Sequence, residues 1–257
     1  MKKYFVISDI HSFYNEMITA LKLKGFDGKN PDHILVVCGD LFDRGPDTNK
    51  VFDFVWFLAR AERLVYVYGN HEELLQDCVR EIRNKKGVSY HHISNGTFDT
   101  VVQFTSMNMY DLYGGTFDNK EFSEKILPLL EFIADYSVDF AEIDDHVFVH
   151  GWIPCDPVNG KVPENWNTED ADWDGARWIN GMQAWHKGAK LPGKTIVCGH
   201  WHASWGHSHL HQDRKEWPQK NRVDWQKSFE IFKDEGIVAI DACTAYTGFC
   251  NCYVIER

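Results

Sequence analysis

The first eighty residues alternate short apolar runs with longer amphipathic segments. Apolar runs at 4–7, 34–38 and 64–68 have the length of buried strands, and each ends abruptly in polar residues. Ser12 is a candidate N-cap for a helix that continues to about residue 24, and Pro46 suits the first turn of a second helix. Strands that alternate with helices predict an α/β fold in which helices cover a sheet.

The alternation stops between about residues 84 and 140. Within this region Glu121–Tyr136 is expected to be helical, with an interruption at Pro128. Four later strands are expected at 147–149, 195–198, 237–240 and 252–255. Residues 203–230 are rich in Trp, His and Lys and are expected to form a variable loop. Because no linker or repeat is present, residues 1–257 are interpreted as a single domain that carries a cap-like insertion at about 84–140.

Polar residues with metal-binding side chains directly follow the predicted strands. They form five segments, which contain Asp9 and His11, then Asp40, Asp43 and Arg44, then Asn70 and His71, then His150, and finally His200 and His202. In such folds ligands collect at the carboxyl ends of strands, so we expect the five segments to meet. One segment alone is more often a strand-end cap. Five together favour a metal site, because carboxylate, imidazole and amide-oxygen ligands suit Mn²⁺, Fe or Zn²⁺.

The acidic composition argues against a nucleic-acid partner. The chain has a formal net charge of −11, with 44% hydrophobic and 25% charged residues, as in ordinary globular proteins. This charge disfavours stable nucleic-acid binding, which needs a cationic surface. No apolar segment approaches the length of a membrane span, and the seven cysteines lack Cys-x-x-Cys spacing. We therefore expect a reduced, cytoplasmic protein with no membrane partner.

The five segments also carry a resemblance to a known family. In order they contain DIH, GDLFDRG, GNHE, the lone His150 and GHWH. The chain resembles calcineurin-like metallophosphoesterases, and in particular the phosphoprotein phosphatase branch, which includes bacterial and phage Ser/Thr phosphatases and the symmetrical diadenosine tetraphosphatases. The tail from Ile240 to Gly248 is similar to this branch as well. The resemblance implies two central mixed β-sheets flanked by helices, in a four-layer αββα sandwich.

A two-metal centre is implied by the resemblance. Asp40 would bridge two ions of Mn, Fe or Zn, with Mn expected in vitro, and a hydroxide shared by both ions would attack phosphorus. Asp9 and His11 would complete the shell of one ion, together with His202, which has a second interpretation as a residue that only lines the site. The ligands of the other ion would be Asn70, His150 and His200.

Further roles follow from the same resemblance. Arg44 would contact phosphate, and His71, oriented by Asp43, would protonate the leaving oxygen. A second phosphate-binding arginine is expected, and Arg177 is the one arginine between positions 151 and 199. The alternatives are a structural hydrogen-bonded pair for His71 and Asp43, and for Arg177 a surface ion pair with Asp172 or Asp174.

Several functions remain open at this stage. The main interpretation is a Ser/Thr protein-phosphatase-like phosphomonoesterase that acts on a phosphoprotein or a small phosphate ester. The alternatives are a symmetrical diadenosine tetraphosphate hydrolase, a nucleic-acid end phosphatase or phosphodiesterase, and a non-catalytic metal-binding regulatory module. Trp201 is expected to shape the wall of the site. The alternating histidines at 207, 209 and 211 are expected to project together from an extended segment, as a third metal site or a solvated loop.

Overall fold

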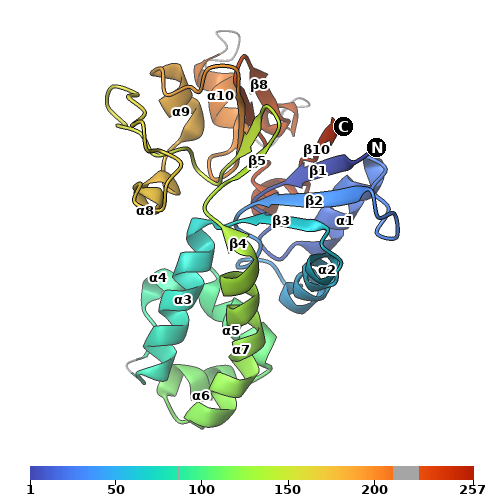
Figure 1. Cartoon of the computed structure of the whole chain (residues 1–257). Helices are drawn as coiled ribbons and strands as arrows, with labels where there is room; N and C mark the ends of the chain where they lie inside the picture. Colours follow the sequence, from blue (N-terminus) through green and yellow to red (C-terminus); the bar gives the residue numbers. More distant parts are fainter. Residues whose placement is uncertain (86, 211–225) are drawn as a thin grey trace.

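The computed structural model describes residues 1–85, 87–210 and 226–257, and in these residues it contains two five-stranded sheets (Figure 1). The first sheet has the strand order β10–β1–β2–β3–β4. Its strands are β1 (Lys3–Ile7), β2 (His33–Cys38), β3 (Leu64–Val67), β4 (Ser137–Val138) and β10 (Tyr253–Glu256). Strands β1 to β4 run parallel, and β10 pairs antiparallel with β1, so the two chain termini lie side by side. The sheet is mixed, as predicted.

The second sheet is built from the later part of the chain, in the order β5–β6–β7–β9–β8. Its strands are β5 (Ala141–Ile143), β6 (His146–Phe148), β7 (Thr195–Cys198), β8 (Phe232–Asp234) and β9 (Ile237–Ala239). Strands β6, β7 and β9 run parallel in the centre, with antiparallel strands at both edges. The carboxyl ends of both sets of parallel strands are therefore available to build one site.

Alternating side chains explain why the two sheets pack face to face. Val6 and Val36 belong to a core of buried strand residues that lies between the sheets, together with Val197 and Val238 from the second sheet. The residues next to them along each strand, such as Phe5, point into separate cores shared with helices. Successive residues of a strand face opposite sides of the sheet, so each sheet is buried on both faces. The four-layer αββα fold is confirmed.

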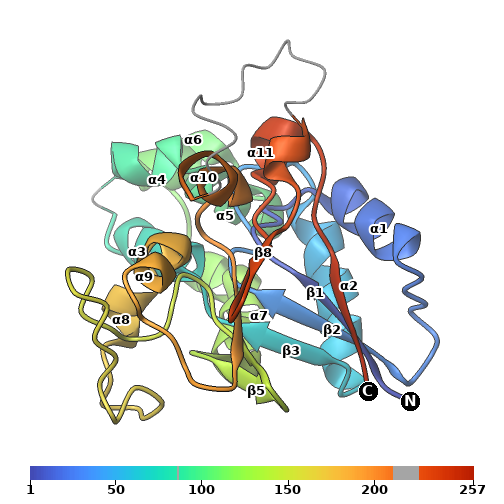
Figure 2. The same ribbon diagram turned by 90° about the horizontal axis from the view of Figure 1, so that it is seen from above.

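Helices cover the outer faces of the two sheets (Figure 2). On the first sheet these are α1 (Tyr14–Leu23) and α2 (Thr48–Arg60), and α3 (Asn70–Arg83) follows β3. On the second sheet they are α8 (Trp173–Ala176), α9 (Gly181–His186) and α10 (Ala203–His209), with α11 (Thr244–Thr247) near the end of the chain. No helix among the described residues is long and apolar enough to cross a membrane.

The region expected to be a cap-like insertion is helical and continues from α3 (Figure 1). It contains α4 (Tyr90–Ser94), α5 (Thr97–Thr105), α6 (Met109–Gly114) and α7 (Asn119–Tyr136). The helices share the core of the first sheet, through residues such as Phe98, Phe122 and Phe132. The expected interruption at Pro128 is wrong, because α7 continues through it as one helix of 18 residues.

Two other local expectations differ from the structure. Ser12 does not cap α1, because its hydroxyl is hydrogen-bonded to that of Thr48 at 3.0 Å. The expected loop at 203–230 contains α10 and a short 3-10 helix at 226–229, and residues 211–225 lie outside the described residues. His207 and His209 lie on α10 and not on an extended segment, so their side chains point in different directions. His211 lies outside the described residues.

Candidate metal centre

Polar residues that follow strands of both sheets line one cavity of about 180 Å³. The polar segments that follow the predicted strands therefore lie together at one edge of the sheets, as expected. The lining residues are Asp9, His11, Asp40, Arg44, Asn70, His71, Leu74, His91, Asn95, Trp178, His200, His202, Asp241, Cys243 and Ala245. Two predicted residues, Asp43 and His150, are buried next to this set and contact its members.

The loops of the site adopt left-handed backbone angles that side-chain-bearing residues rarely use. The φ angles lie between 50° and 75° for Asp9, His11, Asp40, Asp43, Arg44 and His200. Each such residue costs roughly 1–2 kcal/mol relative to a right-handed conformation. Such angles persist only where surrounding contacts hold them, and they concentrate at functional sites. The same turns let the carboxylate and imidazole groups converge.

Two glycines allow these turns to approach one another closely. A Cβ atom on Gly39, which has φ +79°, would collide with the His150 ring, and one on Gly69 would collide with Asp40. Any other residue would therefore push apart the loops after β2, β3 and β6.

Glu72 ties the loops after β2 and β3 together from below. Its side chain is 1% exposed. One carboxylate oxygen accepts hydrogen bonds from the backbone N–H groups of Asp40 (3.0 Å) and Gly69 (2.8 Å), and the other accepts from that of Leu41 (3.0 Å). Three charge-assisted hydrogen bonds satisfy this buried carboxylate and hold the Asp40 backbone in place. This role of Glu72 is not predicted from the sequence.

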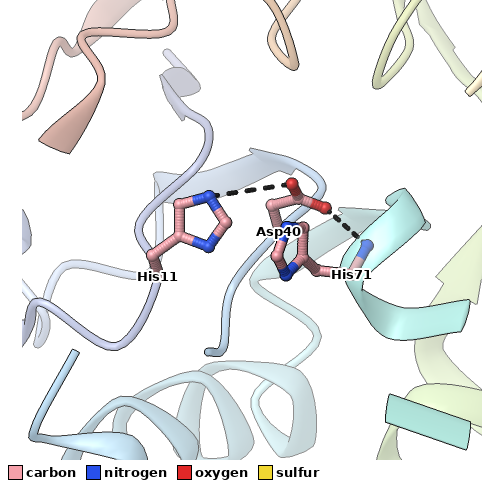
Figure 3. A group of neighbouring side chains, drawn as sticks. All are labelled: His11, Asp40 and His71. Atoms are coloured by element: carbon pink, nitrogen blue, oxygen red, sulfur yellow. Dashed lines mark hydrogen bonds and ion pairs between the residues drawn. The ribbon is translucent and has the colours of Figure 1, made fainter. Parts of the chain in front are cut away.

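Asp40 lies at the centre of the site, between His11 and His71 (Figure 3). Its Oδ2 is 3.8 Å from Nε2 of His11, and its Oδ1 is 3.3 Å from Nε2 of His150. Oδ1 also accepts a hydrogen bond from the backbone N–H of His71 at 3.0 Å. The two carboxylate oxygens thus face two different imidazoles, as a bridging ligand would. Burial raises the pKa of Asp40, and the nearby Asp9 and Glu72 carboxylates oppose its ionisation further, although His71 favours it.

His150 supplies a structural test of whether a cation fits this site. Its Nδ1 is 2.8 Å from the carbonyl oxygen of Cys38, which can only accept a hydrogen bond, so Nδ1 carries a proton. In the neutral ring Nε2 is then a lone pair, yet it lies 2.8 Å from Oδ1 of Asn70 and 3.3 Å from Oδ1 of Asp40. With Asn70 in this orientation, three lone-pair atoms converge. A metal ion satisfies all three, so the residues present fit a metal.

Burial favours the neutral form of His11, His200 and His202, which is the form that a metal ligand requires. Burial, together with the nearby His150 and His71, lowers the pKa of His200 to about 2. Burial also lowers the pKa values of His11 and His202. Each of two groups of side chains has ligand atoms close enough to surround one ion, and Asp40 belongs to both. They are His11 with Asp40 and His71, and Asp40 with His150 and His200.

Asp9 and His202 line the cavity but lie outside those two groups. The Asp9 carboxylate accepts a hydrogen bond from the backbone N–H of His200, at 3.0 Å to Oδ2, and so joins the loops after β1 and β7. His202 precedes the first residue of α10. A further carboxylate, Asp241, lines the same cavity after β9 and is buried; burial and the neighbouring Asp9 raise its pKa.

His71 and Asp43 form a close buried pair. Nδ1 of His71 donates to Oδ2 of Asp43 at 2.7 Å, and the Thr97 hydroxyl donates to the same oxygen at 2.8 Å. The backbone N–H of Asp43 donates to the hydroxyl of Thr100 at 2.9 Å, so two residues of α5 hold this aspartate. Burial disfavours the charged form of His71, but the attraction of Asp40 and the bond to Asp43 outweigh it and raise the pKa of His71.

The guanidinium group of Arg44 spans the space between two histidines. Nη1 lies 3.1 Å from Nε2 of His11, and Nη2 lies 3.0 Å from Nε2 of His71. Because an imidazole lone pair serves one partner at a time, a metal ion on Nε2 of His11 would require Arg44 to release that nitrogen. The planar fork of Arg44 would then be available to phosphate oxygens.

Arg177 lies away from this cavity, contrary to the expected second phosphate contact. Its Nη2 donates to Asp139 at 2.7 Å, its Nη1 pairs with Asp174, and its guanidinium lies over the ring of Tyr68 at 4.6 Å. It lines a separate cavity of about 280 Å³ with Glu73 and these neighbours. The ion pair with Asp174, which was the alternative interpretation, is present.

Some lining residues could not be recognised in the sequence. His91 and Asn95, on and just after α4, reach the cavity from the helical insertion. The expected wall residue Trp201 is not among the lining residues, whereas Trp178 is. Both tryptophans lie edge-on to the ring of His200, with centroid distances of 5.8 Å for Trp178 and 6.4 Å for Trp201. The position of Trp201 between His200 and His202 in the sequence did not reveal that Trp178 would face the cavity instead.

Comparison with known proteins agrees with this geometry. The family model described as calcineurin-like phosphoesterase matches residues 2–228. The chain belongs to this family. The predicted resemblance is thereby confirmed, and the family's fold agrees with the two mixed sheets and their helical layers.

The chain is also similar to curated proteins that are named as tetraphosphatases. Over 161 residues the chain is 30% identical to the asymmetrical bis(5'-nucleosyl)-tetraphosphatase of Bacillus velezensis, covering 60% of this chain and 58% of the relative. It is 36% identical over 90 residues to the symmetrical bis(5'-nucleosyl)-tetraphosphatase of Buchnera aphidicola, covering 35% of this chain and 31% of the relative. The chain thus matches less than two thirds of the length of these curated relatives.

One solved structure shows the same fold over the full chain. It is a cold-active protein-tyrosine phosphatase from a Shewanella species, with a TM-score of 0.51 and 16% identity, and the match covers 100% of this chain and 76% of that one. At this identity the likeness concerns the fold alone.

Proposed function

We propose that this chain hydrolyses dinucleoside tetraphosphates at a two-metal centre. The observation that carries the proposal is the convergence of Asp40, His150 and Asn70 lone pairs, which fits a metal ion at the wall of a cavity of about 180 Å³. The names of the curated relatives favour a tetraphosphate over a phosphoprotein substrate. This revises the main interpretation of the sequence, a protein-phosphatase-like monoesterase, in favour of its first alternative.

The metal ligands we propose fall into two groups that share Asp40. Asp9 and His11, with His202 beside them, would hold one ion. The other ion would be held by Asn70, His150 and His200. When bound, two such ions supply Lewis-acid stabilisation of phosphate charge and activation of water. The mixed oxygen and nitrogen donors suit Mn, Fe or Zn, and we propose Mn for assays in vitro.

The remaining polar groups act on the substrate directly. Arg44 would bind the non-bridging oxygens of the scissile phosphate, because its two Nη atoms already point into the cavity beside His11 and His71. His71, whose Nδ1 donates to Asp43, would donate a proton to the leaving oxygen through Nε2 once Arg44 has released that nitrogen to bind phosphate. Asp43 acts through His71 and is a positioning residue.

A comparison of substrates tests the proposal. With Mn²⁺ present, kcat/KM is measured for diadenosine tetraphosphate, a phosphoserine peptide and a 5′-phosphorylated oligonucleotide. We expect the tetraphosphate to exceed both others by at least about tenfold. Product separation then shows where the chain is cut, since symmetrical cleavage yields two ADP and asymmetrical cleavage yields ATP and AMP. Preferred turnover of the phosphopeptide would restore the monoesterase interpretation.

We further propose that the reaction takes place in the cytoplasm. All seven cysteines are free, which suits a reducing compartment. Fractionation of the source cells, with detection of the chain by antibody, tests this, and recovery from the culture medium would contradict it.

A further inference from the structure

Trp178 leaves a large part of its indole in water at the wall of the catalytic cavity. Trp178 is 46% exposed, and most of the other residues that line the cavity are polar. Among the described residues that line the cavity, it is the one tryptophan, tyrosine or phenylalanine. A single exposed aromatic residue is ordinary on a protein surface, but an exposed indole in a polar catalytic cavity offers a flat apolar contact to whatever enters.

The size of the cavity decides which part of a substrate reaches that indole. At about 180 Å³ the cavity is smaller than the roughly 300–1,000 Å³ of pockets that enclose small organic ligands. The proposed metal ligands and Arg44 line this small cavity, so the scissile phosphate must lie among them. The organic groups of the substrate therefore extend past the wall, where Trp178 lies beside His200 with ring planes at 87°.

The negative net charge of the chain also favours a stacking contact with the substrate over further ionic contacts outside the metal centre. The chain has a formal net charge of −11, and Arg44 is the one lysine or arginine among the described residues that line the cavity. Phosphates beyond the scissile one, or acidic residues of a peptide, thus find little cationic surface outside the metal centre. A neutral heteroaromatic ring meets no such penalty and gains affinity by stacking.

We propose that Trp178 is the stacking surface for a nucleobase of the substrate, which assigns the substrate to the nucleoside polyphosphates. This inference rests on the proposed function. Trp201 provides a matched control, because it is 41% exposed and also lies edge-on to His200, yet it does not line the cavity. The two tryptophans therefore differ chiefly in the feature on which the inference depends.

The test measures product inhibition in Trp178→Ala, Trp178→Leu and Trp201→Ala. Hydrolysis of p-nitrophenyl phosphate is measured with AMP or inorganic phosphate as the inhibitor, and the inhibition constant of AMP divided by that of phosphate reports the contribution of the nucleoside. Stacking of one base on an aromatic side chain predicts a roughly tenfold rise in this ratio for Trp178→Ala. Trp178→Leu, which keeps apolar volume without an aromatic face, is expected to show most of the same rise. Trp201→Ala is expected to leave the ratio unchanged.

Two outcomes would overturn the inference. One is an unchanged ratio in both Trp178 variants. The other is an equal rise in the ratio for Trp201→Ala, which would indicate a general disturbance around His200. The assay uses no tetraphosphate, so it separates this inference from the proposed function. Absence of diadenosine tetraphosphate turnover with a Trp178-dependent ratio contradicts only the function. Turnover of diadenosine tetraphosphate by the wild type, with an unchanged ratio in both Trp178 variants, contradicts only the inference.

Discussion

Replacing His71 with asparagine separates proton donation from metal binding. The imidazole lies 2.7 Å from Asp43 and 3.0 Å from Arg44, and its side chain is 4% exposed. A general acid contributes roughly 10²–10⁴-fold to rate where the leaving group is basic. Phenolate is such a leaving group, because a phenol has a pKa of about 10. We therefore expect His71→Asn to lower kcat for phenyl phosphate about 10³-fold, which corresponds to roughly 4 kcal/mol.

The same variant should be much less impaired with diadenosine tetraphosphate. The leaving group is then a nucleotide phosphate, whose second pKa is about 6, so it departs at neutral pH without a proton. We expect a loss in kcat of about tenfold or less with this substrate, because proton donation contributes little. Comparing the two substrates cancels any effect of the substitution on Arg44, which contacts phosphate in both.

The assay combines steady-state kinetics with metal analysis by inductively coupled plasma mass spectrometry. The metal content of His71→Asn should match that of the wild type. Equal losses on both substrates would refute the role of His71 as a proton donor. A parallel loss of bound metal would instead identify it as a ligand, an arrangement that its closeness to His11 and Asp40 makes worth testing.

Three further substitutions test other parts of the site. Asp40→Asn should remove both metal ions and all turnover, and full metal occupancy would contradict its bridging position. Asp43→Asn should lower the pKa of His71, because the hydrogen bond to Asp43 raises that pKa. The alkaline limb of the kcat–pH profile for phenyl phosphate should therefore shift to lower pH. An unchanged limb would contradict this role of Asp43. Glu72→Gln should lower the free energy of unfolding by about 2–3 kcal/mol in urea denaturation, since an amide N–H₂ would face backbone donors. The control is Asp77→Asn on the same helix, because the Asp77 side chain is 45% exposed; it should change the free energy of unfolding by less than about 0.5 kcal/mol. Similar losses of stability in the two variants would contradict the role of Glu72.

The parts of the site that the sequence could predict depend on sheet topology. Asp9, Asp40 and Asn70 follow strands that run parallel in adjacent positions, so their convergence follows once three strand–helix units are recognised. His150 and His200 follow parallel strands of the second sheet in the same way. Strand limits differed from expectation by one residue or so, which does not move a side chain from one end of the sheet to the other.

Other features depended on contacts that local sequence patterns do not encode. Arg177 is held by Asp139, 38 residues earlier, and no spacing rule predicts that pair. Glu72 depends on the direction of backbone N–H groups in two separate loops. Trp178 and Trp201 both flank His200, and only the three-dimensional path of the chain after α8 decides which of them lines the cavity.

We propose that hydrolysis of a dinucleoside tetraphosphate by this chain would need two metal ions that share Asp40 as a ligand. Stepwise addition of Mn²⁺ to the metal-depleted protein, with diadenosine tetraphosphate turnover recorded at each step, tests it most directly. We expect turnover to stay low up to one equivalent of Mn²⁺ and to reach its maximum at two Mn²⁺ per chain. Full turnover at one equivalent, or turnover that persists in excess chelator, would contradict it.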